Sequence, residues 1–180
     1  MKKIIFAAFL AVVSLSVNAQ QKWAYQADFV EGRACVKDAS GKWGYIDESG
    51  KVISPCQWRS NRYYQEGMGC VVDADEKYGY LDMNGKVVIP CQFFYGDWFS
   101  EGLAAVAISA DYSIKYGFID KTGKIVIPCQ WENAYSFEKG KAKVQVKQDD
   151  GTRVWKTIDK TGKYVEEVEE DDEEDEEEEE

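Results

Sequence analysis

One motif recurs four times along this chain, and this recurrence constrains the fold more than any other feature of the sequence. Each copy opens with an aromatic residue, two variable residues and a glycine. The openings start 35, 35 and 38 residues apart, at Phe29, Tyr64, Phe99 and Phe137. A period of this length is typical of tandem repeats, in which each small unit buries its apolar face against the next. The sequence predicts copies at 29–63, 64–98, 99–136 and 137–165.

Each copy has the alternating hydrophobicity of short β-strands. In the first copy Ala34 and Val36 alternate with polar residues or cysteine, which places one set of side chains on a buried face. A second strand reads aromatic-Gly-aromatic-aliphatic-Asp, and a third is rich in Val and Ile. Between them, an aspartate, two turn-tolerant residues and a glycine predict a type I turn closed by a glycine bulge. These turns run from Asp47 to Gly50, Asp82 to Gly85, Asp120 to Gly123 and Asp159 to Gly162.

The glycine inside the second strand and the proline after the third have positional meaning. The glycine indicates either a bulge or space for an aromatic ring across the bare backbone. Proline at 55, 90 and 128 is expected to end the third strand or to lie on a sheet edge. The aromatic residue three positions later and the opening ring of the next copy are expected to pack between neighbouring copies. The aromatic residues three positions after the prolines are Trp58, Phe93 and Trp131.

These motifs resemble the WG repeat family of bacterial proteins, named for a Trp-Gly pair. Residues 41–47 spell the family segment Gly-Lys-Trp-Gly-Tyr-Ile-Asp, and Gly-Lys followed by Ile-Pro recurs at 85–90 and 123–128. The resemblance covers residues 23–165. It implies a β-rich tandem array that usually has no established activity and is often thought to bind something. In the fourth copy Lys156 replaces the family glycine, so this copy is interpreted as a degenerate cap.

The predicted fold is therefore all-β: an elongated or curved array of about four three-stranded antiparallel repeats. An incomplete β-propeller is the alternative. A lone unit of about 35 residues cannot bury both of its faces, so stability is expected to come from stacking.

The amino-terminal segment predicts export. Lys2 and Lys3 precede an apolar run from Ile4 to Val13, and small or compact residues lead to Ala19. This pattern is typical of a signal peptide, residues 1–19, cleaved after Ala19. A membrane anchor is the alternative, but the apolar run is short for a hydrocarbon core of about 30 Å. Residues 20–165 are then expected to form an exported domain, periplasmic or secreted, without a membrane span.

The carboxyl-terminal segment carries most of the acidity. Of residues 166–180, fourteen are Asp or Glu, and setting them aside leaves 19 carboxylates against 22 Lys and Arg. This tail is predicted to be disordered. Solubility and spacing are its simplest roles, and weak binding of divalent cations or of a basic partner is the other. The body lacks the basic excess that nucleic-acid binding needs. The chain has no histidine, and no cofactor is expected.

The five cysteines follow the repeat register. Cys35 and Cys70 occupy one equivalent position, and the other three follow the prolines. Free cysteines behave as small apolar packing residues, which is the simpler interpretation. In an oxidising compartment a Cys35–Cys70 disulfide is the pairing to test, and an odd count leaves at least one thiol outside any internal pairing.

The turn aspartates are the only recurrent carboxylates that suggest catalysis or calcium binding. Each of Asp47, Asp82, Asp120 and Asp159 has a sufficient structural role in its own turn, and no calcium-loop, Walker or nucleophile-elbow motif is present. Glu31, Glu66 and Glu101 are interpreted as local hydrogen-bond acceptors. The sequence therefore predicts a protein that is not an enzyme, and an envelope hydrolase acting through the turn carboxylates is a minor alternative.

Aromatic residues outside the repeat register are the candidates for partner binding. They are Tyr63, Phe94, Tyr95 and Trp98. Such rings stack on sugars or anchor protein partners. The predicted function is an exported, non-enzymatic binding or scaffold protein that presents a β surface to a protein or glycan of the cell envelope. The alternative is a structural or cation-buffering protein that acts through its acidic tail.

Overall fold

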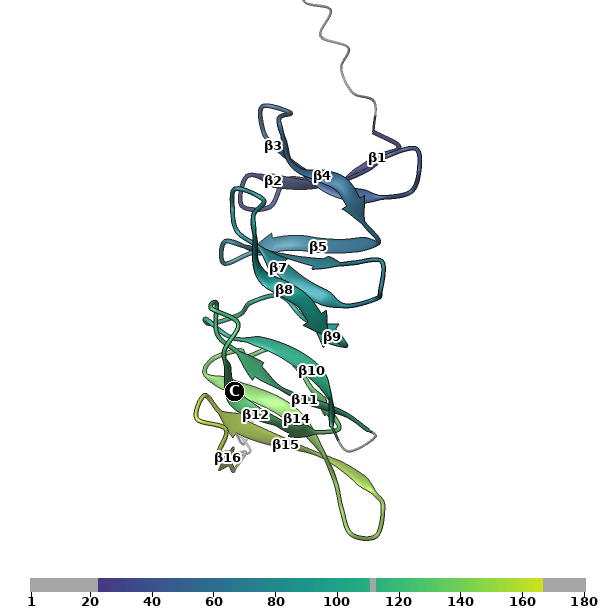
Figure 1. Ribbon diagram of the computed structural model, residues 1–180. Helices are drawn as coiled ribbons and strands as arrows, with labels where there is room; N and C mark the ends of the chain where they lie inside the picture. Colours follow the sequence, from purple (N-terminus) through teal and green to yellow (C-terminus); the bar gives the residue numbers. More distant parts are fainter. Residues whose placement is uncertain (1–22, 111–112, 167–180) are drawn as a thin grey trace, which may run out of the picture.

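The computed structural model describes residues 23–110 and 113–166. These residues form sixteen strands in four antiparallel sheets of four, and each sheet uses strands that are consecutive in the sequence (Figure 1). No helix long and apolar enough to cross a membrane occurs in this described part of the chain. The all-β tandem array predicted from the sequence is confirmed. We call the four sheets units one to four.

The strands of units one and two are β1 (Tyr25–Gln26), β2 (Arg33–Lys37), β3 (Trp43–Asp47), β4 (Val52–Trp58), β5 (Ser60–Gln65), β6 (Met68–Val72), β7 (Tyr78–Leu81) and β8 (Val87–Phe93). Those of units three and four are β9 (Tyr95–Gly96), β10 (Ala104–Ala110), β11 (Ser113–Ile119), β12 (Ile125–Trp131), β13 (Asn133–Ala134), β14 (Lys141–Lys147), β15 (Arg153–Asp159) and β16 (Tyr164–Val165). Each unit thus has one more strand than the three expected. The added strand comes first and is only two residues long in three units, so it leaves little pattern in the sequence.

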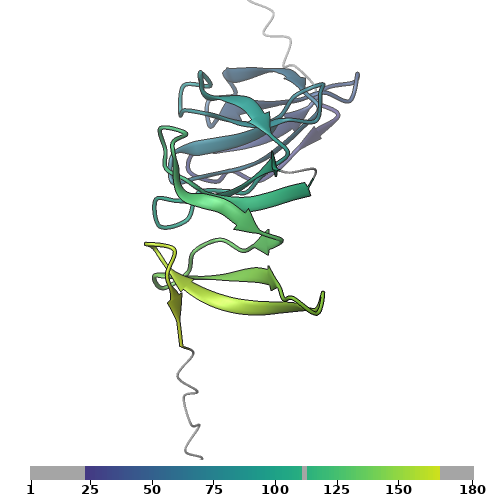
Figure 2. The same cartoon turned by 60° about the horizontal axis from the view of Figure 1, so that its bottom comes forward.

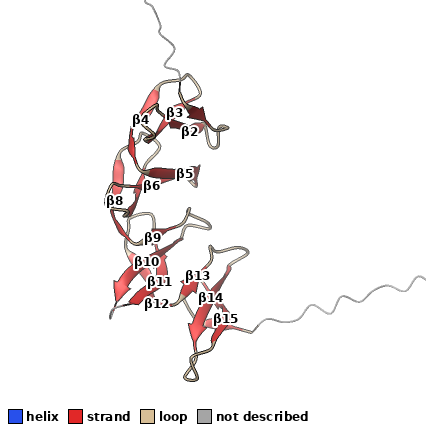
Figure 3. Cartoon of the chain, turned by 90° about the vertical axis from the view of Figure 1, so that its right-hand side faces the viewer, coloured by secondary structure: helices blue, strands red, loops and turns tan. Residues whose placement is uncertain are grey.

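The four units stack one after another in sequence order. The first sheet, in purple, and the fourth, in yellow-green, lie at opposite ends of the stack (Figures 1 and 2). Seen from the side, the stack bends, with β5 on the inner side of the bend and β4 and β8 on the outer side (Figure 3). The array does not close into a ring. The curved array expected from the sequence is therefore the arrangement observed.

The aromatic-x-x-Gly motif forms a tight turn that leads into the second strand of each unit. In unit one, Val30 and Arg33 exchange two backbone hydrogen bonds of 2.9 and 3.0 Å. Between them Glu31 and Gly32 have φ angles of 51° and 70°. Two consecutive positive φ angles define a type I′ turn, in which glycine is the least strained residue. Every unit contains this type I′ turn, so the aromatic-x-x-Gly motif that forms it recurs in every copy.

The glycine of the second long strand is explained by a bulge. In unit two the pairing of β7 with β8 shifts register on both sides of Tyr80, next to Gly79. A Cβ atom on Gly79 would lie 2.7 Å from the backbone nitrogen of Cys91 and 2.8 Å from the carbonyl oxygen of Ile89. The same close approach exists at Gly44 and Gly117. Backbone, and not an aromatic ring, occupies the space that glycine leaves.

The hydrophobic core lies between units. Three of the four core clusters combine residues of two consecutive sheets. At each junction the opening ring of one unit meets a ring of the preceding unit: Tyr64 on Tyr45 at 4.8 Å, Phe99 on Tyr80 at 5.1 Å, and Phe137 on Phe118 at 4.7 Å. Trp58, Phe93 and Trp131 are buried in the same clusters. The expected packing between copies is confirmed.

The two ends of the array differ from the junctions. Phe29 is 39% exposed, because no unit precedes it among the described residues, whereas its equivalent Phe99 is fully buried. In unit four, the sequence has no proline after Pro128, and β16 has only two described residues. Within the described part of the chain, no proline-bearing strand therefore crosses over Lys156 as it crosses over the glycines. A side chain is therefore tolerated at position 156, and the fourth unit closes the stack as a shortened cap.

Candidate functional site

Each turn aspartate holds its own turn through one carboxylate oxygen, Oδ1. The carboxylate of Asp47 accepts hydrogen bonds from the backbone nitrogens of Ser49 and Lys51 and from Ser49 Oγ at 2.6 to 3.0 Å. Asp120 and Asp159 make the same three contacts, and Asp82 makes the two backbone ones. The Ser49 hydroxyl and these N–H groups lower the pKa of Asp47 by stabilising its charged form. No group of acidic or thiol ligands suited to a metal ion occurs among the described residues.

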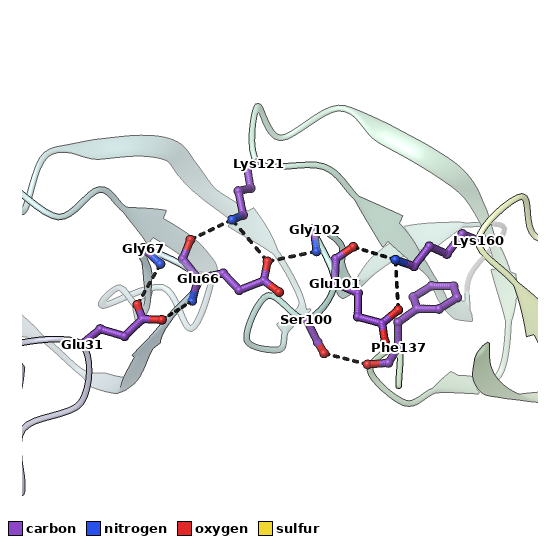
Figure 4. A network of polar contacts seen from close by, with 9 residues as sticks. All are labelled: Glu31, Glu66, Gly67, Ser100, Glu101, Gly102, Lys121, Phe137 and Lys160. Carbon is purple, nitrogen blue, oxygen red and sulfur yellow. Dashed lines mark hydrogen bonds and ion pairs between the residues drawn. The ribbon is translucent and has the colours of Figure 1, made fainter. Parts of the chain in front are cut away.

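The glutamates of the type I′ turns connect units (Figure 4). Glu31 accepts hydrogen bonds of 2.8 Å from the backbone nitrogens of Glu66 and Gly67 in the next unit. Glu66 accepts one of 2.9 Å from Gly102, and Glu101 accepts bonds of 3.0 and 3.2 Å from Gly140. The interpretation of these glutamates as local acceptors was therefore wrong. They are inter-unit clamps, because the turns of successive units lie directly beside one another.

Lysines complete two of these clamps. Lys121 Nζ donates to the carbonyl oxygen of Glu66 at 2.8 Å and lies 3.2 Å from its carboxylate. Lys160 repeats both contacts with Glu101 at 3.1 and 3.0 Å. At the first junction Met83 takes the lysine position, and its carbonyl oxygen accepts hydrogen bonds from the Arg33 guanidinium at 2.8 and 3.1 Å. This edge of the molecule is occupied by structural contacts.

All five cysteines are free thiols in the structure. Cys35 lies in the core cluster between units one and two, and Cys70 in the cluster between units two and three. The suggested Cys35–Cys70 disulfide is therefore not formed in this structure. Burial raises the pKa of both thiols to about 12, so both are protonated at neutral pH.

A cavity of about 280 Å³ receives residues from three units and extends to Tyr25 and Trp43, which pair with Lys37 at the end of β2 away from the type I′ turn. Its lining is mainly aromatic. The lining residues are Tyr25, Ala27, Cys35, Trp43, Asn61, Arg62, Tyr63 and Trp98, and we call this site the aromatic pocket. Tyr63 is 49% and Trp98 41% exposed, so two of its rings are accessible from outside. The size and lining are those of a small ligand site.

A bulge in β5 places Arg62 and Tyr63 in the pocket. The pairing of β5 with β6 is regular up to Asn61 and resumes at Tyr64, so the residues between them are outside the ladder. Bulges redirect side chains in this way and are frequent beside binding sites. The Arg62 guanidinium consequently lies over two rings, 5.7 Å from the centre of Tyr95 and 5.8 Å from that of Trp98.

The aromatic surface continues on both sides of the pocket. Tyr25 packs edge-on against Trp43 at 5.6 Å, with Lys37 Nζ 5.2 Å above the Trp43 ring. Beyond Arg62, the ring of Tyr95 lies 5.6 Å from Tyr78 and 5.5 Å from Tyr116. Rings of three successive units are thus within contact distance of one another or of Arg62.

The structure brings three of the four sequence-predicted partner residues together. Tyr63 and Trp98 line the aromatic pocket, and Tyr95 joins them through Arg62. Phe94 lies apart, with Lys77 Nζ 3.0 Å from the centre of its ring. Sequence reasoning missed Tyr25, Trp43 and Arg62. Trp43 was counted as a repeat residue, and Arg62 has no local pattern because the bulge that positions it is visible only in three dimensions.

The comparisons with known proteins agree with this architecture. A tandem array of small antiparallel sheets with its core between the units defines a β-repeat protein. The family model described as "WG containing repeat" matches residues 43–76, 78–108 and 116–148. The chain belongs to the WG repeat family, and the last match ends before Lys156.

Other comparisons add little. No curated protein matches the sequence. Among solved structures, the chain is similar to the WD40 β-propeller domain of Doa1, with 16% identity and a TM-score of 0.38. That match covers 74% of this chain and 50% of the other, so the chain spans half the length of that structure. A similarity this distant carries no argument about function.

Proposed function

We propose that this chain is an exported, non-enzymatic binding module that presents its aromatic pocket to a protein or glycan partner at the cell envelope. The position of Arg62 carries the proposal, because its guanidinium lies over the rings of Tyr95 and Trp98 beside a cavity built by three units. Arginine, tryptophan and tyrosine in half-buried pockets are the residues that contribute most to binding energy in interfaces.

The hydrogen bonding of the acidic residues supports a non-enzymatic role. A hydrolase acting through turn carboxylates needs two of them to converge on one substrate. Asp47 and its equivalents each accept hydrogen bonds within their own turn. Glu31, Glu66 and Glu101 accept them from the next unit. These carboxylates are therefore committed to the fold.

The amino-terminal sequence supports export. The pair Lys2-Lys3, the apolar run and the small residue Ala19 form the pattern of a signal peptide. These residues and the acidic tail beyond Glu166 lie outside the described residues. Detecting the mature chain in the periplasmic or culture fraction, with residue 20 as its first residue, tests export separately from binding.

Binding is tested with a pull-down from envelope extract and a glycan array, using the full chain and the variant Trp98→Ala. Trp155→Ala is the matched control, because Trp155 is equally exposed but stacks on Tyr135 in unit four at 4.7 Å. The proposal expects a partner that the wild type and Trp155→Ala retain and Trp98→Ala loses. Equal retention by all three proteins contradicts the proposal.

The acidic tail provides the second candidate function. A tail of fourteen carboxylates that the sequence predicts to be disordered would bind divalent cations only weakly, because tight binding needs positioned ligands. A chain lacking residues 166–180 separates the two functions. The pocket proposal expects partner capture to persist without the tail. A phenotype that vanishes with the tail, together with unchanged behaviour of Trp98→Ala, favours the cation-buffering alternative.

A further inference from the structure

The chemistry of the aromatic pocket defines its ligand more narrowly. Arg62 has five N–H donors, and within the described chain its guanidinium has one ionic partner, Asp97, at 3.8 Å. This separation is longer than a hydrogen bond. The Asp97 oxygens accept hydrogen bonds from Trp98 N at 3.0 Å and from Ser136 Oγ at 2.9 Å. The donors of Arg62 are therefore available to an acceptor that enters the pocket.

Asn61 also lines the pocket. Its Nδ2 donates to the carbonyl oxygen of Gly44 at 2.9 Å, which fixes the orientation of the amide. Its Oδ1 is the one buried side-chain polar atom of the described residues that has no hydrogen-bond partner. An unpartnered buried acceptor is unfavourable, but this oxygen is covered by its neighbours and is not open to a ligand. The pocket thus offers its hydrogen-bond donors at Arg62.

The remaining lining residues favour a ligand with a flat apolar face. Four of the lining residues are aromatic, and Ala27 and Cys35 are the only small apolar ones. Ring faces carry partial negative charge and attract the weakly positive C–H groups of a sugar ring. The cavity of about 280 Å³ is large enough for one sugar ring with its substituents.

The charges around the cavity favour an anion. Arg62 and Lys37 both lie over lining rings, Lys37 over Trp43 and Arg62 over Trp98. Asp97, whose carboxylate lies 3.8 Å from the Arg62 guanidinium, already has two hydrogen-bond donors of its own. A carboxylate matches the planar fork of arginine better than a neutral hydroxyl does.

From these features, and resting on the proposed function, we infer that the aromatic pocket binds one uronic acid residue of an acidic polysaccharide. The sugar carboxylate pairs with Arg62, and the apolar sugar face stacks on an aromatic ring of the lining. The neutral sugar of the same stereochemistry would leave the Arg62 donors without a carboxylate at hydrogen-bonding distance.

The test is a tryptophan-fluorescence titration of the full chain, because Trp43 and Trp98 both line the pocket. The probes are trigalacturonate and the neutral galactose trimer of the same linkage. We expect saturable binding of trigalacturonate and affinity for the neutral trimer that is lower by roughly 10- to 100-fold, the usual effect of losing a charged hydrogen bond.

Variants separate the pocket from general charge effects. Arg62→Gln is expected to lose the same roughly 10- to 100-fold in trigalacturonate affinity. Arg59→Gln is the matched control, since this exposed arginine pairs with Glu76 outside the pocket and its loss should change affinity less than about twofold. Tyr63→Ala is a second test that does not depend on folding, because Tyr63 is exposed, and it should also weaken binding.

Three results overturn the inference: no fluorescence change with trigalacturonate, equal affinity for the neutral trimer, or equal losses in Arg59→Gln and Arg62→Gln. If trigalacturonate fails while Trp98→Ala still loses a protein captured by the wild type, the sugar assignment is wrong and the proposed binding function stands. If capture also fails to depend on Trp98, both are wrong.

Discussion

The two ends of the strands follow opposite rules. At the turn end, one residue type recurs from unit to unit: Glu31, Glu66 and Glu101 each bind the backbone of the next unit. At the aromatic end, a ring recurs at the position of Trp43, but the residues at another set of equivalent positions differ. In units one, three and four, one backbone hydrogen bond reaches the same position of the second strand, and its donors are Ala27, Asp97 and Tyr135. The residue at the equivalent position of unit two is Arg62, which lies within the bulge of β5.

This difference separates the residues that hold the units together from the residues that are available to bind a partner. A residue that repeats with the period serves the contact that repeats with it, and that contact is the stacking of units. A residue that changes from unit to unit cannot serve the repeated contact, so it is available for a site that exists once. The aromatic pocket is such a site, because it takes Arg62 from one unit and Trp98 from another.

The largest expected effect comes from breaking the repeated stacking. Phe99→Ala removes a fully buried ring that packs on Tyr80 at 5.1 Å, and we expect a loss of about 3 to 5 kcal/mol in the free energy of unfolding. Phe29→Ala at the equivalent position of unit one is the control, and a clearly smaller loss is expected because Phe29 is 39% exposed and has no ring of a preceding unit among the described residues to pack on. Urea denaturation measures both, and similar losses would refute core formation between units.

The next effect concerns the bulge that every complete unit contains. Gly79→Ala would place a Cβ 2.7 and 2.8 Å from backbone atoms of β8, and we expect a loss of about 1 to 3 kcal/mol from this overpacking. Lys156→Ala, at the equivalent position of unit four, should change stability by less than about 0.5 kcal/mol. Thermal unfolding compares the two variants. An equally mild Gly79→Ala would mean that β8 does not approach β7 so closely.

A smaller effect is expected at the clamps. Burial alone would raise the pKa of Glu66, but the Gly102 N–H and the Lys121 ammonium outweigh it and lower the pKa below the ordinary value of 4.5. A carboxyl with a lowered pKa in the folded state stabilises that state above its unfolded pKa. This contribution is lost as pH falls through the folded value. The thermal midpoint should therefore fall on acidification below about pH 4.5.

Glu66→Gln tests the assignment of this pH dependence. The variant should lose about 1 kcal/mol at neutral pH, because one acceptor of a charged pair is replaced by an amide. It should also show a shallower decline between neutral and acidic pH than the wild type. A variant with the same pH profile as the wild type would show that Glu66 is not one of the titrating clamps.

The smallest effect on stability is expected at the aromatic end. Trp98 is 41% exposed, so Trp98→Ala should change the free energy of unfolding by less than about 1 kcal/mol while abolishing partner capture. Circular dichroism melting and the pull-down together measure both properties. A large loss of stability in Trp98→Ala would assign this ring to the stack and remove the distinction between the two ends.

The sequence predicted the stacked β units because their signals are local or periodic. An aspartate, two tolerant residues and a glycine are enough to predict a hairpin turn, and the recurrence of Tyr64, Phe99 and Phe137 predicts packing between copies. The short first strands escaped prediction, since two residues such as Tyr25 and Gln26 carry no period.

The candidate site was predictable only in part. Tyr63, Tyr95 and Trp98 were identifiable as rings outside the repeat register. Arg62 was not, because its role depends on a bulge in β5 and on rings that arrive from the next unit. The hydrogen-bond partner of the Glu66 carboxylate was also not predictable, since this partner, Gly102, lies 36 residues away in the sequence.

The amino-acid sequence by itself determined that this protein is a β-repeat array, because turn chemistry and hydrophobic period act over a few residues and are written in each copy. Only the tertiary structure decided which side chains meet across units. Such contacts depend on the offset between successive sheets, and that offset is set by packing at the junctions and by no single segment of the chain.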